Sequence, residues 1–382
     1  MPSEGRFRRT AARIRRLVLS ETNAPFVSKD HLRAAKRVAG DDALTQPPLA
    51  FLRDELGAFL EPWLAQDDPD DRLRLIVLPP CDHSDLLGEW ARASGHDTVE
   101  EPTRSLLDHS LEIDFSFISA DERSDVVVIP QLERWFLRSD GGLDVVSRLL
   151  EKLDASNRKC VVGCNSWAWR YLSAVVSATS VLPPGITFEA IDGATLRAWF
   201  QQIEPRQNIR LAANGAQLLS DQEQDKPRVD NYFQELAAHS LGIPWVAWYA
   251  WRRSFRSRTD IEEDPGGQAD SDSEQGVQEG LPQASGSNEP ATIWLAELSK
   301  LRLPNPISIR HLFVLQALLI HGSLTDDEIN AVCPDENHTG AAIALRRANV
   351  IERVNGRLRC SAVAFPMVRA ALADAGFPLD SL

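Results

Sequence analysis

The chain has 382 residues and a mass of 42.4 kDa, which is more than one ordinary domain and predicts two or three. Its formal net charge is −14, and this acidity argues against a general nucleic-acid binder while allowing a local basic surface. No apolar run reaches the roughly 18 residues of a membrane span. The polar, basic N-terminus lacks the apolar core of a secretion signal, so we expect a cytoplasmic protein of bacterial type. The five cysteines form no CxxC pair, which predicts reduced thiols and no metal site.

Residues 1–68 are predicted to form a helical N-terminal segment. The first 38 residues carry ten Lys and Arg against three Asp and Glu, with apolar residues at helical spacing between the arginines. This pattern fits a surface helix with one docked stripe, an arm for an anionic partner, or a helix on a membrane surface. A second helix is predicted from Pro48 to about Leu64.

Residues 69–204 alternate between short apolar runs and amphipathic segments. The runs predict buried parallel strands at Leu73–Leu78, Asp125–Ile129, Lys159–Gly163 and Ile186–Ala190. The segments between and after them predict helices at Asp85–Ala93, Leu143–Leu153, Trp169–Val176 and from Ala194 to Phe200. This alternation predicts an α/β domain with a parallel sheet.

The order of these segments resembles the core of P-loop ATPases of the AAA+ type, over about residues 70–258. The resemblance is carried by VVVIPQLERWFL at 126–137, CVVGCNSW at 160–167 and GIPW at 242–245. It implies a parallel-sheet P-loop NTPase-like domain at 69–204 and a helical lid at 205–259. It also implies a phosphate-binding loop after the first strand, an Asp-Glu pair after the second and a polar sensor after the third.

The sequence departs from this family at the catalytic motifs. The first loop is PPCDHSD at 79–85, which has neither the glycines nor the lysine of a phosphate-binding loop. Pro130 and Gln131 stand where the Asp-Glu pair belongs, and Glu133 follows out of register. Asn165 remains as a sensor candidate. We therefore expect no catalytic residue and no hydrolysis of ATP, with Asp82, Ser84 and Asn165 as candidate cofactor-binding residues should ATP bind.

Two cysteine-containing patterns have alternative interpretations. Cys81-Asp82-His83 follows a predicted strand, where a thiol nucleophile with a histidine base is conceivable, but an ordinary loop that caps the next helix explains it better. Cys160 and Cys164 share one face of an extended strand. That spacing fits either a metal pair or, more commonly, small buried apolar side chains.

The region 205–259 is predicted to be helical, without strands. Three tryptophans three residues apart form a stripe on the predicted helix Trp245–Phe255, and core packing or a partner surface would explain Trp248 and Trp251. Arg252 and Arg253 extend this helix as a basic end that could contact a partner. Residues 260–290 hold nine acidic and no basic residues, which predicts a flexible linker.

Residues 291–382 resemble a winged helix-turn-helix. Helices are predicted at His311–His321, Asp326–Val332 and Asn337–Asn349, followed by a hairpin around Asn355-Gly356 and a closing helix at Phe365–Ala375. The candidate contacts to DNA or protein are Arg346 and Arg347 on the third helix and Arg353, Arg357 and Arg359 on the wing. Nine acidic and nine basic residues cancel in this region, which favours a protein partner over DNA.

Taken together, these features predict a non-catalytic scaffold or regulatory adaptor that docks a protein partner. Two alternatives remain open, a DNA-binding regulator that acts through the winged helix and an ATPase with an unorthodox site.

Overall fold

The computed structural model describes residues 47–103, 107, 113–119, 126–139, 141–203, 209–211, 216–218, 226–256, 293–295, 298, 301–333 and 338–380. The predicted helix before residue 47 and the predicted linker at 260–290 lie outside these residues. None of the helices within them is long and apolar enough to cross a membrane.

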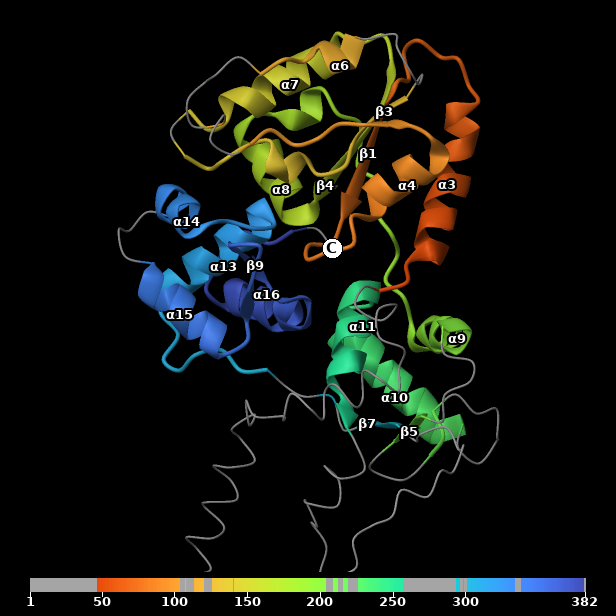
Figure 1. The fold of residues 1–382 in the computed structure, drawn as a ribbon, viewed down its shortest axis with the longest axis vertical. Coiled ribbons are helices and arrows are strands. Elements are labelled where there is room, and N and C mark those ends of the chain that lie inside the picture. The colour runs from red at the N-terminus through yellow and green to blue at the C-terminus, as the bar shows by residue number, and fades with distance from the viewer. Residues whose placement is uncertain are drawn as a thin grey trace, which may run out of the picture.

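A four-stranded parallel sheet forms the centre of the α/β region (Figure 1). Its strands are β1 (Leu73–Leu78), β2 (Asp97–Thr98), β3 (Val126–Ile129) and β4 (Lys159–Asn165), in the order β1-β4-β3-β2. All four residues of β3 and six of the seven in β4 are buried, as expected of strands covered on both faces. The predicted α/β fold is confirmed, and β1, β3 and β4 lie where the hydrophobic runs place them.

Helices cover both faces of this sheet (Figure 1). On one side lie α3 (Ala50–Leu64) and α4 (Leu86–Ser94); on the other lie α7 (Asp144–Asp154) and α8 (Ser166–Val175). Two short elements, α6 (Ser116–Ser119) and the 3-10 helix η1 (Leu132–Arg134), flank β3. Gly163 in β4 allows η1 to form where it does, because a Cβ at this position would lie 2.1 Å from the carbonyl oxygen of Pro130.

The predicted fourth strand at Ile186–Ala190 is wrong. Only Ile186 pairs with the sheet, through a single parallel bridge to Ile76 of β1. The chain then turns away, and the amide of Ile191 donates to the carbonyl oxygen of Gly242 instead (2.9 Å). Ile186 alone joins the run to β1, because its amide donates to the carbonyl oxygen of Leu75 at 2.8 Å and its carbonyl oxygen accepts from the Val77 amide at 2.7 Å.

The next region packs three helices around an aromatic core. They are α9 (Gly193–Ile203), α10 (Lys226–His239) and α11 (Pro244–Arg253). The expectation that this region has no strands is wrong. β5 (Ile209–Leu211) pairs in parallel with β7 (Ile293–Leu295), which also pairs antiparallel with β6 (Phe255–Arg256). The domain predicted to start at residue 291 therefore begins with a strand, β7, that pairs with β5 and β6 from before residues 260–290.

The C-terminal unit, residues 301–333 and 338–380, contains three helices and a hairpin in the predicted order. The helices are α13 (Ile309–His321), α14 (Asp326–Val332) and α15 (Thr339–Arg347), and the hairpin pairs β8 (Ile351–Val354) with β9 (Arg357–Cys360). A 3-10 turn, η3 (Ala362–Ala364), leads into the closing helix α16 (Phe365–Asp374). Asn355 and Gly356 both have positive φ at the hairpin turn, as expected for an Asn-Gly pair.

Candidate functional site

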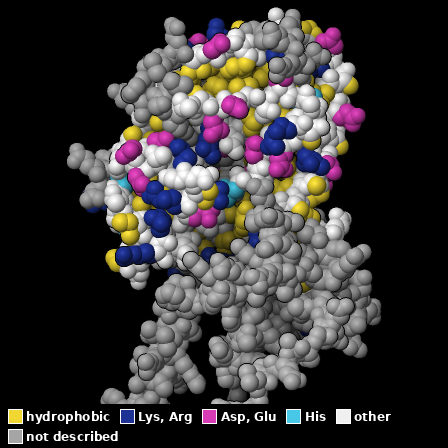
Figure 2. Space-filling model, viewed as in Figure 1, with side chains coloured by type: hydrophobic (Ala, Val, Ile, Leu, Met, Phe, Trp, Pro, Cys, Tyr) yellow, Lys and Arg dark blue, Asp and Glu magenta, His cyan; other side chains and the backbone are white. Residues whose placement is uncertain are grey.

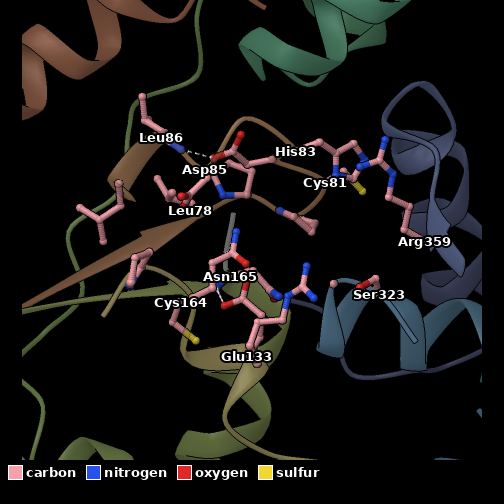
Figure 3. Close-up of a pocket in the computed structure, with 18 of the residues that line it drawn as sticks. Leu78, Cys81, His83, Asp85, Leu86, Glu133, Cys164, Asn165, Ser323 and Arg359 are labelled. Atoms are coloured by element: carbon pink, nitrogen blue, oxygen red, sulfur yellow. Dashed lines mark hydrogen bonds between the residues drawn. The ribbon is translucent and has the colours of Figure 1, made fainter. Parts of the chain in front are cut away.

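The carboxyl ends of three neighbouring parallel strands, β1, β4 and β3, meet at one edge of the sheet, where α/β folds place their ligand sites. A cavity of about 280 Å³ lies there. Its walls come from the loop after β1, the turn after β3, the end of β4 and the C-terminal unit (Figure 3). The α/β region and the C-terminal unit, which are far apart in the sequence, therefore both line this cavity.

Asp82 in the loop after β1 binds the start of α4. Its Oδ1 accepts hydrogen bonds from the Ser84 amide (3.0 Å) and the Ser84 hydroxyl (2.6 Å), and its Oδ2 accepts one from the Leu86 amide (3.2 Å). These amides belong to the donors that a phosphate would use at a helix N-terminus. Asp82 and the buried Ser84, two predicted cofactor-binding residues, are thus brought together but bind each other.

Asp85 adds a second carboxylate at the same helix start. It has a positive φ of 54°, and its carboxylate lies against Gly88, where a Cβ would meet Oδ2 at 2.1 Å. Arg92 donates to Asp85 at 3.4 Å. Burial raises the pKa of Asp85, and the neighbouring Asp82 raises it further. The loop therefore carries two acidic side chains, Asp82 and Asp85, and no lysine.

Glu133 is the residue that the sequence places out of register, yet the structure brings it into the cavity. It lies on η1, is 8% exposed, and accepts a hydrogen bond from the Asn165 amide at 3.1 Å. Burial raises its pKa. Asn165, the predicted sensor, caps α8 by accepting from the Ala168 amide at 2.8 Å and donates to the carbonyl oxygen of Ile320 at 3.3 Å. One side of the predicted sensor thus binds the C-terminal unit.

Other contacts also join the C-terminal unit to the α/β region. The buried Ser166 hydroxyl donates to Asp380 at 2.6 Å, and Asp380 also binds Arg369. Arg138 donates to the Gln316 side chain at 3.1 Å and to a carbonyl oxygen of α14 at 3.2 Å. These buried and half-buried contacts fix the unit over the strand ends.

The wing arginines predicted to contact DNA or protein are engaged within the chain. Arg353 binds Asp326, Arg357 binds Glu328 and Arg359 binds Glu352. Arg357 and Arg359 also line the cavity, so the β8–β9 hairpin faces the α/β region. Arg353 is exposed and lies outside the cavity. That these three arginines contact DNA or a protein partner stays a prediction.

The remaining predicted contacts divide by exposure. Arg346 and Arg347 on α15 are exposed. Trp248 and Trp251 are fully buried, and their rings lie 5.8 and 4.4 Å from that of Phe200. The interpretation of these tryptophans as partner contacts is wrong, because both rings are buried in the aromatic core and leave no surface for a partner. Beyond them, Arg252 and Arg253 are half-buried.

Cys81 and His83 connect the loop after β1 to the β8–β9 hairpin. A hydrogen bond with Cys360 and burial raise the pKa of Cys81 well above its usual value, which does not favour the thiolate that a nucleophile needs. Burial, followed by the charge of Arg359, lowers the pKa of His83 to about 3. Cys160 and Cys164 are both buried, and burial raises the pKa of each. Within the described residues, no cluster of three or more His, Cys, Asp or Glu side chains could hold a metal.

Sequence reasoning missed several residues of this site. Trp245 of the GIPW segment is fully buried and donates its indole N–H to the carbonyl oxygen of Pro80 at 3.0 Å. Arg134 lines the cavity beside Glu133, and Asp380 anchors the C-terminus. The available signal was a charged residue among apolar ones directly after a predicted strand, as at Glu133 within QLERWFL.

No protein-family model and no curated protein matches the sequence. Among solved structures, RuvB R170A of Thermotoga maritima is similar at 10% identity and a TM-score of 0.33, over 87% of this chain and 96% of that one. The ORC2 protein of Aeropyrum pernix, in ADPNP-ADP complexes, is similar at 11% identity and a TM-score of 0.37, over 89% of this chain and 98% of that one. The Walker-type ATPase paby2304 of Pyrococcus abyssi is similar at 12% identity and a TM-score of 0.34, over 83% of this chain and 95% of that one. At these TM-scores, the fold assignment comes from the sheet itself.

Proposed function

We propose that this chain is a non-hydrolysing regulatory adaptor, built from a degenerate AAA+-type domain and a winged-helix unit. The observation that carries the proposal is the Asp82 carboxylate, which accepts the amide hydrogen bonds at the start of α4. A phosphate at this place would have to displace Asp82 and meet the charge of Asp85, with no lysine to neutralise it.

The hydrolytic machinery is also incomplete at the end of β3. Pro130 and Gln131 line the cavity there and supply no carboxylate for magnesium. Glu133 is the remaining acid, and its Oε2 already accepts from the Asn165 amide. These residues support binding and structural roles better than phosphoryl transfer.

The proposed docking element is α15, the third helix of the winged-helix unit. Ile343 is 44% exposed, and Arg346 and Arg347 follow it at helical spacing on the exposed side. An apolar residue beside two arginines fits an acidic, partly apolar protein surface. The wing itself is occupied with the α/β region, so a partner would meet α15 first.

Titration of a fluorescent ATP analogue, with and without magnesium, tests the non-catalytic part of the proposal. We expect no saturable binding up to millimolar nucleotide and no ATP hydrolysis above background. Magnesium-dependent hydrolysis that is lost in the Glu133→Gln variant would refute it and favour the ATPase alternative. The Asp70→Asn variant, which changes an exposed acid outside the cavity, is the matched control.

Binding of duplex DNA is the second candidate function, because Arg346 and Arg347 are exposed. If it operates, binding falls with salt and is weakened by Arg346→Gln but not by Arg353→Gln, since Arg353 is paired with Asp326. No shift of labelled duplex DNA at low salt would remove this candidate.

A further inference from the structure

We propose that Cys81 and Cys360 form a disulfide within the chain when hydrogen peroxide oxidises them. Cys81 lies in the loop after β1 of the α/β region, and Cys360 is the last residue of β9 in the C-terminal unit. The two thiols are therefore a modification site that joins the two parts of the molecule. This inference goes beyond the adaptor role, because it depends on neither the nucleotide site nor α15.

The loop that carries Cys81 packs against the β8–β9 hairpin. His83 of this loop has its Nε2 4.0 Å from Oε1 of Glu352 on β8. Across the hairpin, Glu352 pairs with Arg359, the residue before Cys360. Cys81 and Arg359 line the same cavity (Figure 3), and at this contact the thiols of Cys81 and Cys360 share a hydrogen bond. A disulfide needs two cysteines whose side chains point towards each other, and thiols that share a hydrogen bond meet this requirement.

Helix α11 holds both sides of this contact in place. Trp245 is fully buried and donates its indole N–H to the carbonyl oxygen of Pro80, the residue before Cys81, at 3.0 Å. The 3-10 helix η3, which begins two residues after Cys360, packs against the same helix. Cys81 also has a positive φ of 64°, which residues other than glycine rarely adopt and which persists where the surrounding structure fixes it. The approach of the two thiols is therefore set by the packing of whole elements.

The cavity gives a small oxidant access to Cys81. This residue is half-buried and lines the cavity of about 280 Å³, whereas Cys360 is 1% exposed. Charged side chains of both signs surround the hollow on this face (Figure 2), so water and small polar molecules can enter it. Hydrogen peroxide therefore meets Cys81 first, and Cys360 is the resolving thiol.

The reaction takes two steps. The Cys81 thiolate attacks one oxygen of hydrogen peroxide, the O–O bond breaks, and Cys81 becomes a sulfenic acid while hydroxide leaves. The Cys360 sulfur then loses its proton and attacks the Cys81 sulfur, the S–O bond breaks, and a second hydroxide leaves. Each hydroxide takes up the proton that a thiol has released. In total, two thiols and one hydrogen peroxide give one disulfide and two water molecules, and the two sulfurs lose two electrons to the peroxide.

The groups around Cys81 make this a slow site at neutral pH. The hydrogen bond with Cys360 and burial raise the pKa of the Cys81 thiol. The charge of Arg359 opposes this shift, and the charge of Glu352 adds to it. Because the thiolate is the reacting form, the rate should rise about ten-fold per pH unit up to the ordinary cysteine pKa of about 8.5 and continue to rise above it.

Peroxide treatment of the reduced, folded chain tests the proposal. Free thiols are counted in denaturant with a chromogenic disulfide reagent, and linked peptides are identified by mass spectrometry after the remaining thiols are alkylated. We expect the count to fall from five to three, with the Cys81 and Cys360 peptides linked, and to be restored by dithiothreitol. Because the bond joins distant parts of the chain, the oxidised protein should unfold at a higher urea concentration than the reduced one.

Three variants serve as controls. Cys81→Ser and Cys360→Ser should each form no disulfide, whereas Cys333→Ser removes another buried cysteine of the C-terminal unit and should still lose two thiols. If Cys360→Ser fails to fold because its site is buried, Cys81→Ser carries the comparison from a half-buried position.

Five free thiols after peroxide treatment would overturn the proposal. A link between other cysteines, or Cys81 oxidised to a sulfinic acid while Cys360 stays free, would overturn it as well. Formation of the same link at the same rate in the urea-unfolded chain would show that the fold does not position the two thiols, and this also counts against the proposal. Hydrolysis of ATP would refute the adaptor proposal and leave this site standing.

Discussion

Replacing Asp82 by alanine is expected to loosen the start of α4. The carboxylate accepts hydrogen bonds from two backbone amides and the Ser84 hydroxyl, and its negative charge lies at the positive end of the helix dipole. Loss of a helix cap costs about 0.5–2 kcal/mol. Asp82 is half-buried, so water replaces part of what is lost, and we expect a decrease of about 1–2 kcal/mol in the free energy of unfolding.

Urea unfolding followed by tryptophan fluorescence measures this loss, and amide hydrogen exchange shows where it arises. The Ser84 and Leu86 amides should lose protection in Asp82→Ala, because their acceptor is gone. Asp70→Ala removes an exposed acid of equal charge and should change neither quantity. Equal stability of the two variants, or unchanged protection of both amides, would refute the view that Asp82 fills the phosphate position.

Three further changes test the packing around the site. His83 has a pKa of about 3 in the fold and 6.5 when exposed, so the free energy of unfolding should be highest above pH 6.5 and fall as the pH drops towards 3. By pH 5 this loss is about 2 kcal/mol. Urea unfolding at several pH values that gives the same pH slope for His83→Gln as for the unchanged protein would contradict this prediction. Trp251→Ala should cost about 3–5 kcal/mol because the ring is fully buried, whereas a ring used only for partners would leave the unfolding midpoint unchanged. Gly163→Ala forces a Cβ to within 2.1 Å of the Pro130 carbonyl oxygen and should cost about 1–3 kcal/mol; Gly340→Ala, with open space around it, is the calorimetric control and should not destabilise.

Local patterns were sufficient to predict the central strands and the C-terminal hairpin. The runs at β1, β3 and β4 are apolar because both faces of the sheet are covered, and a run of this kind is visible without knowledge of its neighbours. Asn355-Gly356 predicts its hairpin because both residues adopt positive φ at the turn. The three-strand sheet of β5, β6 and β7 was not predictable, because its strands have two or three residues and β7 is more than thirty residues from β6.

The candidate site divides in the same way. The sequence by itself determined that the loop after β1 contains no lysine and that a polar Asn165 ends β4, because these are matters of residue identity at one position. Only the tertiary structure decided that Glu133 enters the cavity, that Trp248 and Trp251 are core, and that Arg359 faces the strand ends. Each of these depends on contacts between segments far apart in the chain, which are set by the packing of whole elements and leave no local periodicity to read.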